Sequence, residues 1–186
     1  LRILNEPTAA ALAYGYTNAS AQKIVVFDFG GGTFDVTLLD LSGNVFEVLA
    51  TGGDPFLGGD DVDLAIVDRM AEAVLRAHRF DPRQDPQLLE RLRVEAERIK
   101  ITLSNLPSST VEIHAPSVAP GGKDLSFNFS MTRGDLEALL GPLVDRAVEV
   151  CRGALSTARL SPGDFEQVLL VGGSTRIPLV KRRVAE

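Results

Sequence analysis

In two segments of the chain, an apolar strand is followed directly by glycines and then by residues with hydroxyl side chains. The first lies at residues 27–33 and the second at residues 170–175. Glycine has no Cβ, so backbone N–H groups in such a turn can surround a phosphate, and a neighbouring hydroxyl adds a donor. Both segments are therefore candidate phosphate or nucleotide loops. The structural alternatives are a hairpin turn at the first segment and a helix N-cap at Ser174 in the second.

Neither glycine segment matches the two best-known nucleotide motifs. Both lack the Gly-Lys-Ser/Thr ending of the P-loop, and neither has the spacing of the dinucleotide fingerprint that opens a helix. The sequence therefore disfavours those two nucleotide-binding folds.

Carboxylates next to the first glycine segment are the candidates for metal and acid–base chemistry. Asp28 ends an apolar run, where a carboxylate is costly to bury, and it suits a Mg²⁺ ion that keeps its waters. Asp35 follows the turn on the expected facing strand. Glu6, just before Pro7, is a candidate general base or water-orienting group. The alternatives are a carboxylate that accepts turn N–H bonds for Asp28, and a favourable helix N-terminal charge for Glu6.

One face of a predicted helix over residues 87–104 carries polar groups. Glu97, Lys100 and Ser104 lie at i, i+3 and i+7, so they share a face next to the apolar stripe. That face could hydrogen-bond a ribose and a purine. The alternative is a solvated Glu97–Lys100 ion pair, which the local sequence favours.

The remaining polar candidates are interpreted as structural. Asp60, Asp61 and Asp63 lack the spacing of a calcium loop and are expected to cap a helix. The two histidines, His78 and His114, have no partner at zinc-ligand spacing. Cys151 falls in an apolar stripe, where a buried and inert thiol is expected.

Composition limits the class of protein. Of 186 residues, 45% are hydrophobic and 24% charged, which is typical of a folded globular chain, and no apolar run is long enough to span a membrane. The net charge of −6 argues against nonspecific binding to nucleic acid or anionic lipid. A single cysteine and the absence of an opening signal peptide predict a reducing compartment, the cytoplasm. Leu1 in place of Met and an uncapped basic end predict a chain cut from a longer protein.

Hydrophobic periodicity and turn residues predict the elements that must position these side chains. Strands are expected at 24–27, 33–39, 45–50, 111–113, 125–129 and 168–171. Helices are expected after Glu6, from about 60 to 78, from 87 to 104, from 132 with a break at 141–142, and after 173. The first three strands form a meander that needs a covering layer, and a new unit begins near residue 60.

Five motifs, taken in order, strongly resemble the DnaK-type heat-shock chaperones, the seventy-kilodalton class. They lie at residues 5–11, 27–35, 57–61, 97–104 and 171–178. The resemblance implies lobe II of the ATPase domain, an α/β, actin-like and ribonuclease-H-like fold with a mixed sheet. It further implies a larger subdomain at 1–57 and 131–186, into which a smaller one at 58–130 is inserted.

The resemblance also implies roles for individual residues. The catalytic set is Glu6, which helps place the attacking water, Asp28, which holds Mg²⁺ through water, and Thr33. The second phosphate loop comprises Gly30, Gly31, Gly32 and Thr33. The adenosine contacts are Glu97, Lys100 and Ser104 on one side and Gly172, Gly173, Ser174 and Arg176 on the other. The implied cofactors are ATP or ADP and Mg²⁺.

The resemblance implies a chaperone whose ATP hydrolysis drives the binding and release of client polypeptides. Its partners would be client peptides, a J-domain co-chaperone and a nucleotide-exchange factor, with no nucleic acid and no membrane. The chain alone is expected to be monomeric and nearly inactive. Pro55-Phe56 stands where most relatives have Thr-His. Gly53-Asp54 followed by Asp60-Asp61 resembles the iron–sulfur-assembly branch or another divergent bacterial member. The alternative is an actin-like filament protein or a sugar-kinase-type phosphotransferase with the same fold.

Overall fold

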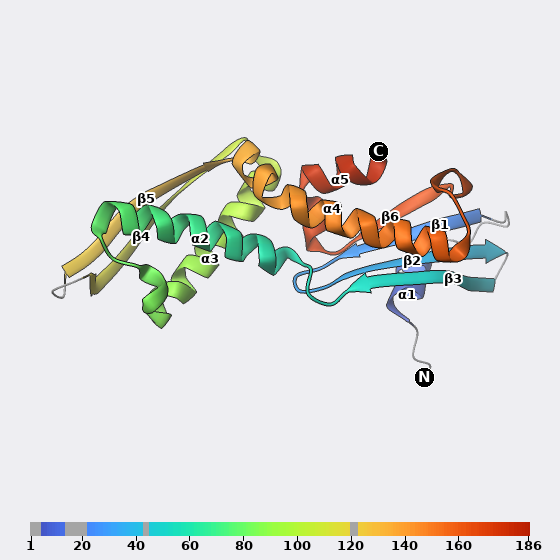
Figure 1. Ribbon diagram of the computed structural model, residues 1–186, viewed down its shortest axis with the longest axis horizontal. Coiled ribbons are helices and arrows are strands. Elements are labelled where there is room, and N and C mark those ends of the chain that lie inside the picture. Colours follow the sequence, from blue (N-terminus) through green and yellow to red (C-terminus); the bar gives the residue numbers. More distant parts are fainter. Residues whose placement is uncertain (1–4, 14–21, 43–44, 120–122) are drawn as a thin grey trace. The chain divides into compact units, whose positions relative to one another are not determined.

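The computed structural model describes residues 5–13, 22–42, 45–119 and 123–186, and they form two compact units (Figure 1). Unit 1 comprises Leu1–Gly59, Leu143–Arg176 and Val180–Glu186, and unit 2 comprises Asp60–Pro142 and Ile177–Leu179. The subdomain boundaries implied by the resemblance, at 57/58 and 130/131, stay a prediction. No helix among the described residues is long and apolar enough to cross a membrane.

A four-stranded mixed sheet is the frame of unit 1. Its strands are β1 (Gln22–Phe29), β2 (Phe34–Ser42), β3 (Val45–Asp54) and β6 (Gln167–Val171), in the order β3-β2-β1-β6. Short connections join β1, β2 and β3, which therefore pair antiparallel, whereas β6 pairs parallel with β1. The predicted meander and the late strand are confirmed, and each strand is longer than its apolar run. The expected burial of the late strand is wrong for most of it, because Leu169 is buried whereas Val168 and Leu170 are exposed.

The two faces of this sheet carry different side chains because strand residues alternate. On one face, helix α1 (Glu6–Ala13) buries Ala11 against Ile24, Val26, Leu39, Leu41 and Leu169. Asp28 follows Ile24 and Val26 in the same alternation, so its carboxylate lies on the α1 face. The expected closing glycine of this helix, Gly15, lies outside the described residues.

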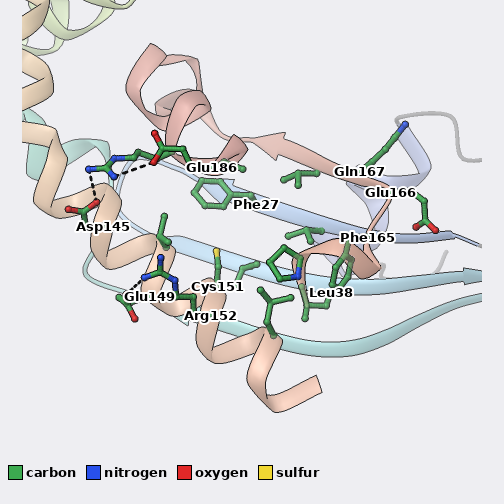
Figure 2. A pocket seen from close by; sticks show the side chains of 18 residues that line it. Phe27, Leu38, Asp145, Glu149, Cys151, Arg152, Phe165, Glu166, Gln167 and Glu186 are labelled. Atoms are coloured by element: carbon green, nitrogen blue, oxygen red, sulfur yellow. Dashed lines mark hydrogen bonds and ion pairs between the residues drawn. The ribbon is translucent and has the colours of Figure 1, made fainter. Parts of the chain in front are cut away.

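The other face of the sheet lies beneath helix α4 (Arg133–Ala158), and the two line a cavity of about 730 Å³ (Figure 2). Phe27 and Leu38 belong to its lining. Burial raises the pKa of the Cys151 thiol, which also lines it, to about 12, as expected for an inert cysteine. At one side Arg183 of helix α5 (Pro178–Ala185) pairs with Asp145 at 3.3 Å.

Unit 2 packs two helices with a hairpin. The helices are α2 (Gly59–His78) and α3 (Pro86–Asn105), and the hairpin is β4 (Ser108–Ala119) with β5 (Lys123–Thr132). Asp85 caps α3 by accepting from the amides of Gln87 and Leu88, both at 2.9 Å. The predicted apolar stripe of α3 is confirmed, since Leu88, Leu92, Ala96, Ile99 and Leu103 are all buried. The predicted hairpin turn at 120–122 lies outside the described residues.

Helix α4 begins as predicted but continues where a break was expected. Thr132 and Asp135 form the predicted capping box, with the Asp135 carboxylate accepting from the Thr132 amide at 3.0 Å. The predicted break at 141–142 is wrong, because the helix runs through Pro142. Burial of Leu140 and Val144 on either side of the proline offsets the one hydrogen bond that its missing N–H removes.

Candidate nucleotide site

A tight glycine turn joins β1 to β2. The strands pair up to Phe29 opposite Phe34, and the Gly30 amide then donates to the Thr33 carbonyl at 3.0 Å. Gly31, Gly32 and Thr33 are exposed, and their amides donate to no other residue in the described ranges. Successive free N–H groups at the tip of a turn form a concave donor set for an anion. The first glycine segment is thus both a hairpin turn and a set of phosphate-type donors.

The turn is held from outside by close backbone contacts. The Gly30 carbonyl accepts two hydrogen bonds, from the Gly59 amide at 3.0 Å and from the Ser174 hydroxyl at 2.9 Å. A Cβ on Gly58 would lie 2.0 Å from the Gly31 carbonyl oxygen, so only glycine fits there. The sequence motif at 57–61 includes Gly58, but the sequence indicated no role for it. Because Gly58 has no side chain, this segment can pack against the turn and support it.

The second glycine segment reaches the first through strand pairing. Because β6 runs parallel to β1, with Val171 opposite Asp28, the residues after β6 arrive beside the end of β1. Gly172 has φ +88°, and a Cβ there would lie 2.3 Å from the Phe29 carbonyl oxygen. Gly173 has open space around it. The two predicted loops therefore meet at one end of the sheet.

Two side chains of the second segment have different surroundings. Ser174 is only 5% exposed, and the alternative of a helix N-cap is wrong for it, because α5 begins at Pro178 and the hydroxyl bonds to Gly30. Arg176 is exposed and has no ion-pair partner within the described ranges. The guanidinium of Arg176 is exposed close to the second glycine segment, so it is available to a ligand.

A cleft of about 400 Å³ beside the glycine turn gathers three carboxylates. Glu6, from the first turn of α1, Asp28 and Asp35 all line it, and no lysine or arginine is among its described lining residues. Burial raises the pKa of Asp28, and the charges of Glu6 and Asp35 raise it further. The cleft is therefore electronegative and suits a cation.

The arrangement of these carboxylates fits one kind of metal site. No group of three or more carboxylate, histidine or cysteine side chains lies close enough to hold a metal directly, as far as the described residues go. Mg²⁺ commonly keeps several waters and is held by one or two carboxylates plus ligand phosphates. Asp28 therefore fits Mg²⁺ held through water and does not fit a closed protein cage. The larger cavity under α4 contains none of the predicted site residues.

The polar face of α3 lies in unit 2, where Lys100 has an unexpected partner. Its ammonium pairs with Asp63 of α2 at 2.5 Å, with the two side chains 12% and 14% exposed. Lys100 is therefore not on a solvated face, as the alternative expected, because its side chain is mostly buried and pairs with Asp63. Asp63 does not cap α2 as expected, because only Asp60 and Asp61 fall in the first turn.

The rest of this face is consistent with a polar surface. Glu97 is exposed and Ser104 is half-buried, with its hydroxyl donating to the Lys100 carbonyl at 2.9 Å. The role of this face in adenosine binding stays a prediction.

The family model described as Hsp70 protein matches residues 1–186, the whole chain. The chain belongs to the Hsp70 family. Proteins named chaperone protein DnaK from Thermotoga neapolitana, Thermotoga petrophila and Thermotoga maritima are each 46% identical to it over 187 residues. These alignments cover 100% of this chain and 31% of each relative, so the chain spans about a third of their length.

Hsp70 membership confirms the DnaK-type resemblance drawn from the five motifs. The mixed sheet with helices agrees with the actin-like ATPase fold of that family, so the predicted fold class is confirmed as well. The assignment to an iron–sulfur-assembly branch stays a prediction.

Proposed function

We propose that this Hsp70-family chain is the ATP-binding lobe II of a chaperone ATPase domain, which binds adenine nucleotide together with Mg²⁺. The observation that carries the proposal is the parallel pairing of β6 with β1, which gathers both glycine segments beside Asp28. A donor-rich loop next to an electronegative cleft suits a ligand that is itself anionic and arrives with a cation.

The phosphates would lie at the turn between β1 and β2. The free amides of Gly31, Gly32 and Thr33 would donate to phosphate oxygens, while Gly30 anchors the turn. Mg²⁺, when bound, would neutralise the charge that develops on the phosphates. Asp28 would hold it through water, because its carboxylate lies in the cleft beside the turn.

Glu6 would orient the attacking water and accept its proton. It lines the same cleft as Asp28 and comes from the first turn of α1. Phosphoryl transfer depends on positioning and charge stabilisation, so a modest side-chain set suffices.

The adenosine would be bound by the two sets of residues that the resemblance names. The first set is Gly172, Gly173, Ser174 and Arg176, and the second is Glu97, Lys100 and Ser104. Open space at Gly173 and the exposed guanidinium of Arg176 support the first set. The shared helical face supports the second.

For the whole protein we propose that ATP hydrolysis drives binding and release of client polypeptides. The partners would be clients, a J-domain co-chaperone and a nucleotide-exchange factor, in the cytoplasm. One lobe supplies only part of the charge stabilisation, so the 186-residue chain should bind nucleotide weakly, as a monomer, and hydrolyse it negligibly. The Hsp70 match does not favour the filament or sugar-kinase alternatives.

Titration calorimetry of the 186-residue chain with ADP, with and without Mg²⁺, tests the lobe assignment. Weak binding that strengthens with Mg²⁺ is expected, and Asp28→Asn should remove the Mg²⁺ dependence. Absence of any ADP binding, or turnover equal to that of an intact chaperone ATPase, would contradict the proposal.

A substitution in the intact protein tests the role of Glu6. Glu6→Gln should lower ATP hydrolysis by about a hundredfold or more while ADP affinity stays nearly unchanged. Glu47→Gln, which removes the same charge at an exposed position of β3, serves as the control. Equal losses of affinity and rate in Glu6→Gln would identify a structural residue instead.

A further inference from the structure

The segment that joins β3 to α2, residues 54–59, supports the glycine turn between β1 and β2, which is called the phosphate turn below. The Gly59 amide donates to the Gly30 carbonyl at 3.0 Å. The missing side chain of Gly58 lets its backbone pack directly on Gly31. Close-packed backbone contacts of this kind leave little room for the segment to shift. The interactions that fix the path of residues 54–59 therefore also fix the phosphate turn.

Asp54 fixes this segment through both oxygens of its carboxylate. Its Oδ1 accepts from the Phe56 amide at 3.0 Å, which makes an Asx turn at the start of the segment. Its Oδ2 pairs with the Arg146 guanidinium of α4 at 2.5 Å, and the Asp54 side chain is only 14% exposed. Because charge-assisted bonds are short and directional, the ion pair holds the carboxylate in the orientation that the Asx turn needs.

Helix packing brings Arg146 to this carboxylate. A Cβ on Gly52 of β3 would lie 3.1 Å from the Cγ1 atom of Val150, so the end of β3 packs closely on α4. Arg146 lies one turn before Val150 on the helix, and Asp54 lies two residues after Gly52 on the strand. Each pair of residues shares a face of its element. The packing at Gly52 therefore places the guanidinium beside the carboxylate.

We propose that Arg146 and Asp54 are positioning residues for phosphate binding: their ion pair holds residues 54–59 against the phosphate turn. This inference rests on the proposed function and deepens it. Neither residue is among the lining residues of the carboxylate cleft, so the pair acts through the turn. Breaking the pair should loosen the turn and weaken the binding of phosphates. Binding of a nucleoside without phosphates should change little.

Titration calorimetry of the 186-residue chain with Mg²⁺–pyrophosphate and with adenosine tests this separation. Arg146→Met removes the charge but keeps the length, and Asp54→Asn removes the charge but keeps an acceptor for the Phe56 amide. Each should weaken Mg²⁺–pyrophosphate by about fivefold to tenfold and adenosine by less than about twofold. The double variant should lose no more than either single variant, because all three lack the same interaction. Arg146→Lys, which keeps the charge, should recover part of the loss.

Arg183→Met is the matched control. Arg183 of α5 pairs with Asp145, the neighbour of Arg146 on α4, and is 40% exposed against 49% for Arg146. Its loss should leave both affinities unchanged. If Arg146→Met does not fold in urea denaturation, Asp54→Asn alone carries the test. Equal weakening of the two ligands, unchanged affinity for both, or additive losses in the double variant would overturn the proposal.

A measurement without ligand keeps this inference separate from the proposed function. If wild type bound neither ligand, the proposed function would fail, whereas the hold on the turn would still be measurable. Nuclear magnetic resonance of Arg146→Met should show faster amide exchange at Phe56 and Gly59 and a lower backbone order parameter at Gly31. The Arg183→Met variant should match wild type at these positions. Unchanged exchange and order in Arg146→Met would refute the positioning role.

Discussion

Removing the Lys100 side chain should destabilise the fold, and the reason is the carboxylate that it leaves behind. The Lys100–Asp63 pair joins α3 to α2 with both side chains mostly removed from water. The second oxygen of Asp63, Oδ1, is buried and accepts no hydrogen bond from the described residues. Lys100→Ala would therefore strand a carboxylate that has little other solvation.

The burial of the pair sets the size of this effect. Breaking a fully buried pair by removing one partner costs about 3–5 kcal/mol. The residual exposure of 12% and 14% lets water reach the pair, so we expect a loss of stability somewhat below that range, about 2–3 kcal/mol at pH 7. Arg93→Ala, which breaks the exposed Arg93–Glu90 pair on the same helix, should cost less than about 0.5 kcal/mol.

The loss should depend on pH in a defined direction. Burial raises the pKa of Asp63, and Lys100 opposes this through its hydrogen bond and charge, so the pKa of Asp63 should rise further in Lys100→Ala. A carboxyl whose folded pKa exceeds its unfolded value contributes stability at low pH, and this is lost as pH rises through the folded pKa. The cost of Lys100→Ala should therefore be larger at pH 7 than near pH 4.

Urea denaturation followed by circular dichroism measures these free energies, since the chain has no tryptophan. Lys100→Ala, Asp63→Asn and the double variant form a thermodynamic cycle. The double variant should recover most of the stability lost in Lys100→Ala and should lack its pH dependence. A loss in Lys100→Ala no larger than that in Arg93→Ala, or one independent of pH, would refute this reasoning. Because the double variant should lose little stability, its affinity for ADP tests whether Lys100 contacts the nucleoside.

Three further predictions concern unit 1. Gly58→Ala should destabilise the chain by about 1–3 kcal/mol in urea denaturation, because the added Cβ would collide with the Gly31 backbone. Gly153→Ala, which has open space around it in α4, should stabilise the chain by about 0.5–1 kcal/mol. Similar effects of the two variants would contradict the close packing of Gly58 on Gly31. Asp28→Asn should raise the melting temperature at pH 7, because the raised pKa of Asp28 makes its charged form unfavourable in the folded chain, and this difference from wild type should disappear near pH 4. A lower melting temperature of the variant at pH 7 would contradict this. The Cys151 thiol, with its pKa raised to about 12, should react with iodoacetamide at least about tenfold more slowly in the folded chain than in urea by mass spectrometry, and equal rates would show it to be accessible.

Local sequence was sufficient for most elements of the fold. The apolar stripe of α3, the Thr132–Asp135 capping box and the glycine turn after β1 each depend on residues within a few positions of one another. Such patterns act through local backbone geometry, so spacing alone predicts them. The same locality made the two glycine segments and Asp28 recognisable as candidates for phosphate and metal binding.

The proline in α4 shows where local reasoning failed. Propensity predicts a break at Pro142 because the ring removes a hydrogen bond and crowds the preceding turn. The buried Leu140 and Val144 contribute more than the proline removes, and that burial depends on the packed environment of the helix.

Only the tertiary structure decided which distant residues meet. The pairing of β6 with β1 brings Ser174 to Gly30, and the packing of α2 on α3 brings Asp63 to Lys100. Neither partner is encoded in local spacing, because the choice among polar groups far apart in the chain is made by which apolar faces are buried together. Burial then removes water as a competitor, so a hydroxyl or a carboxylate must take the partner that the packing presents.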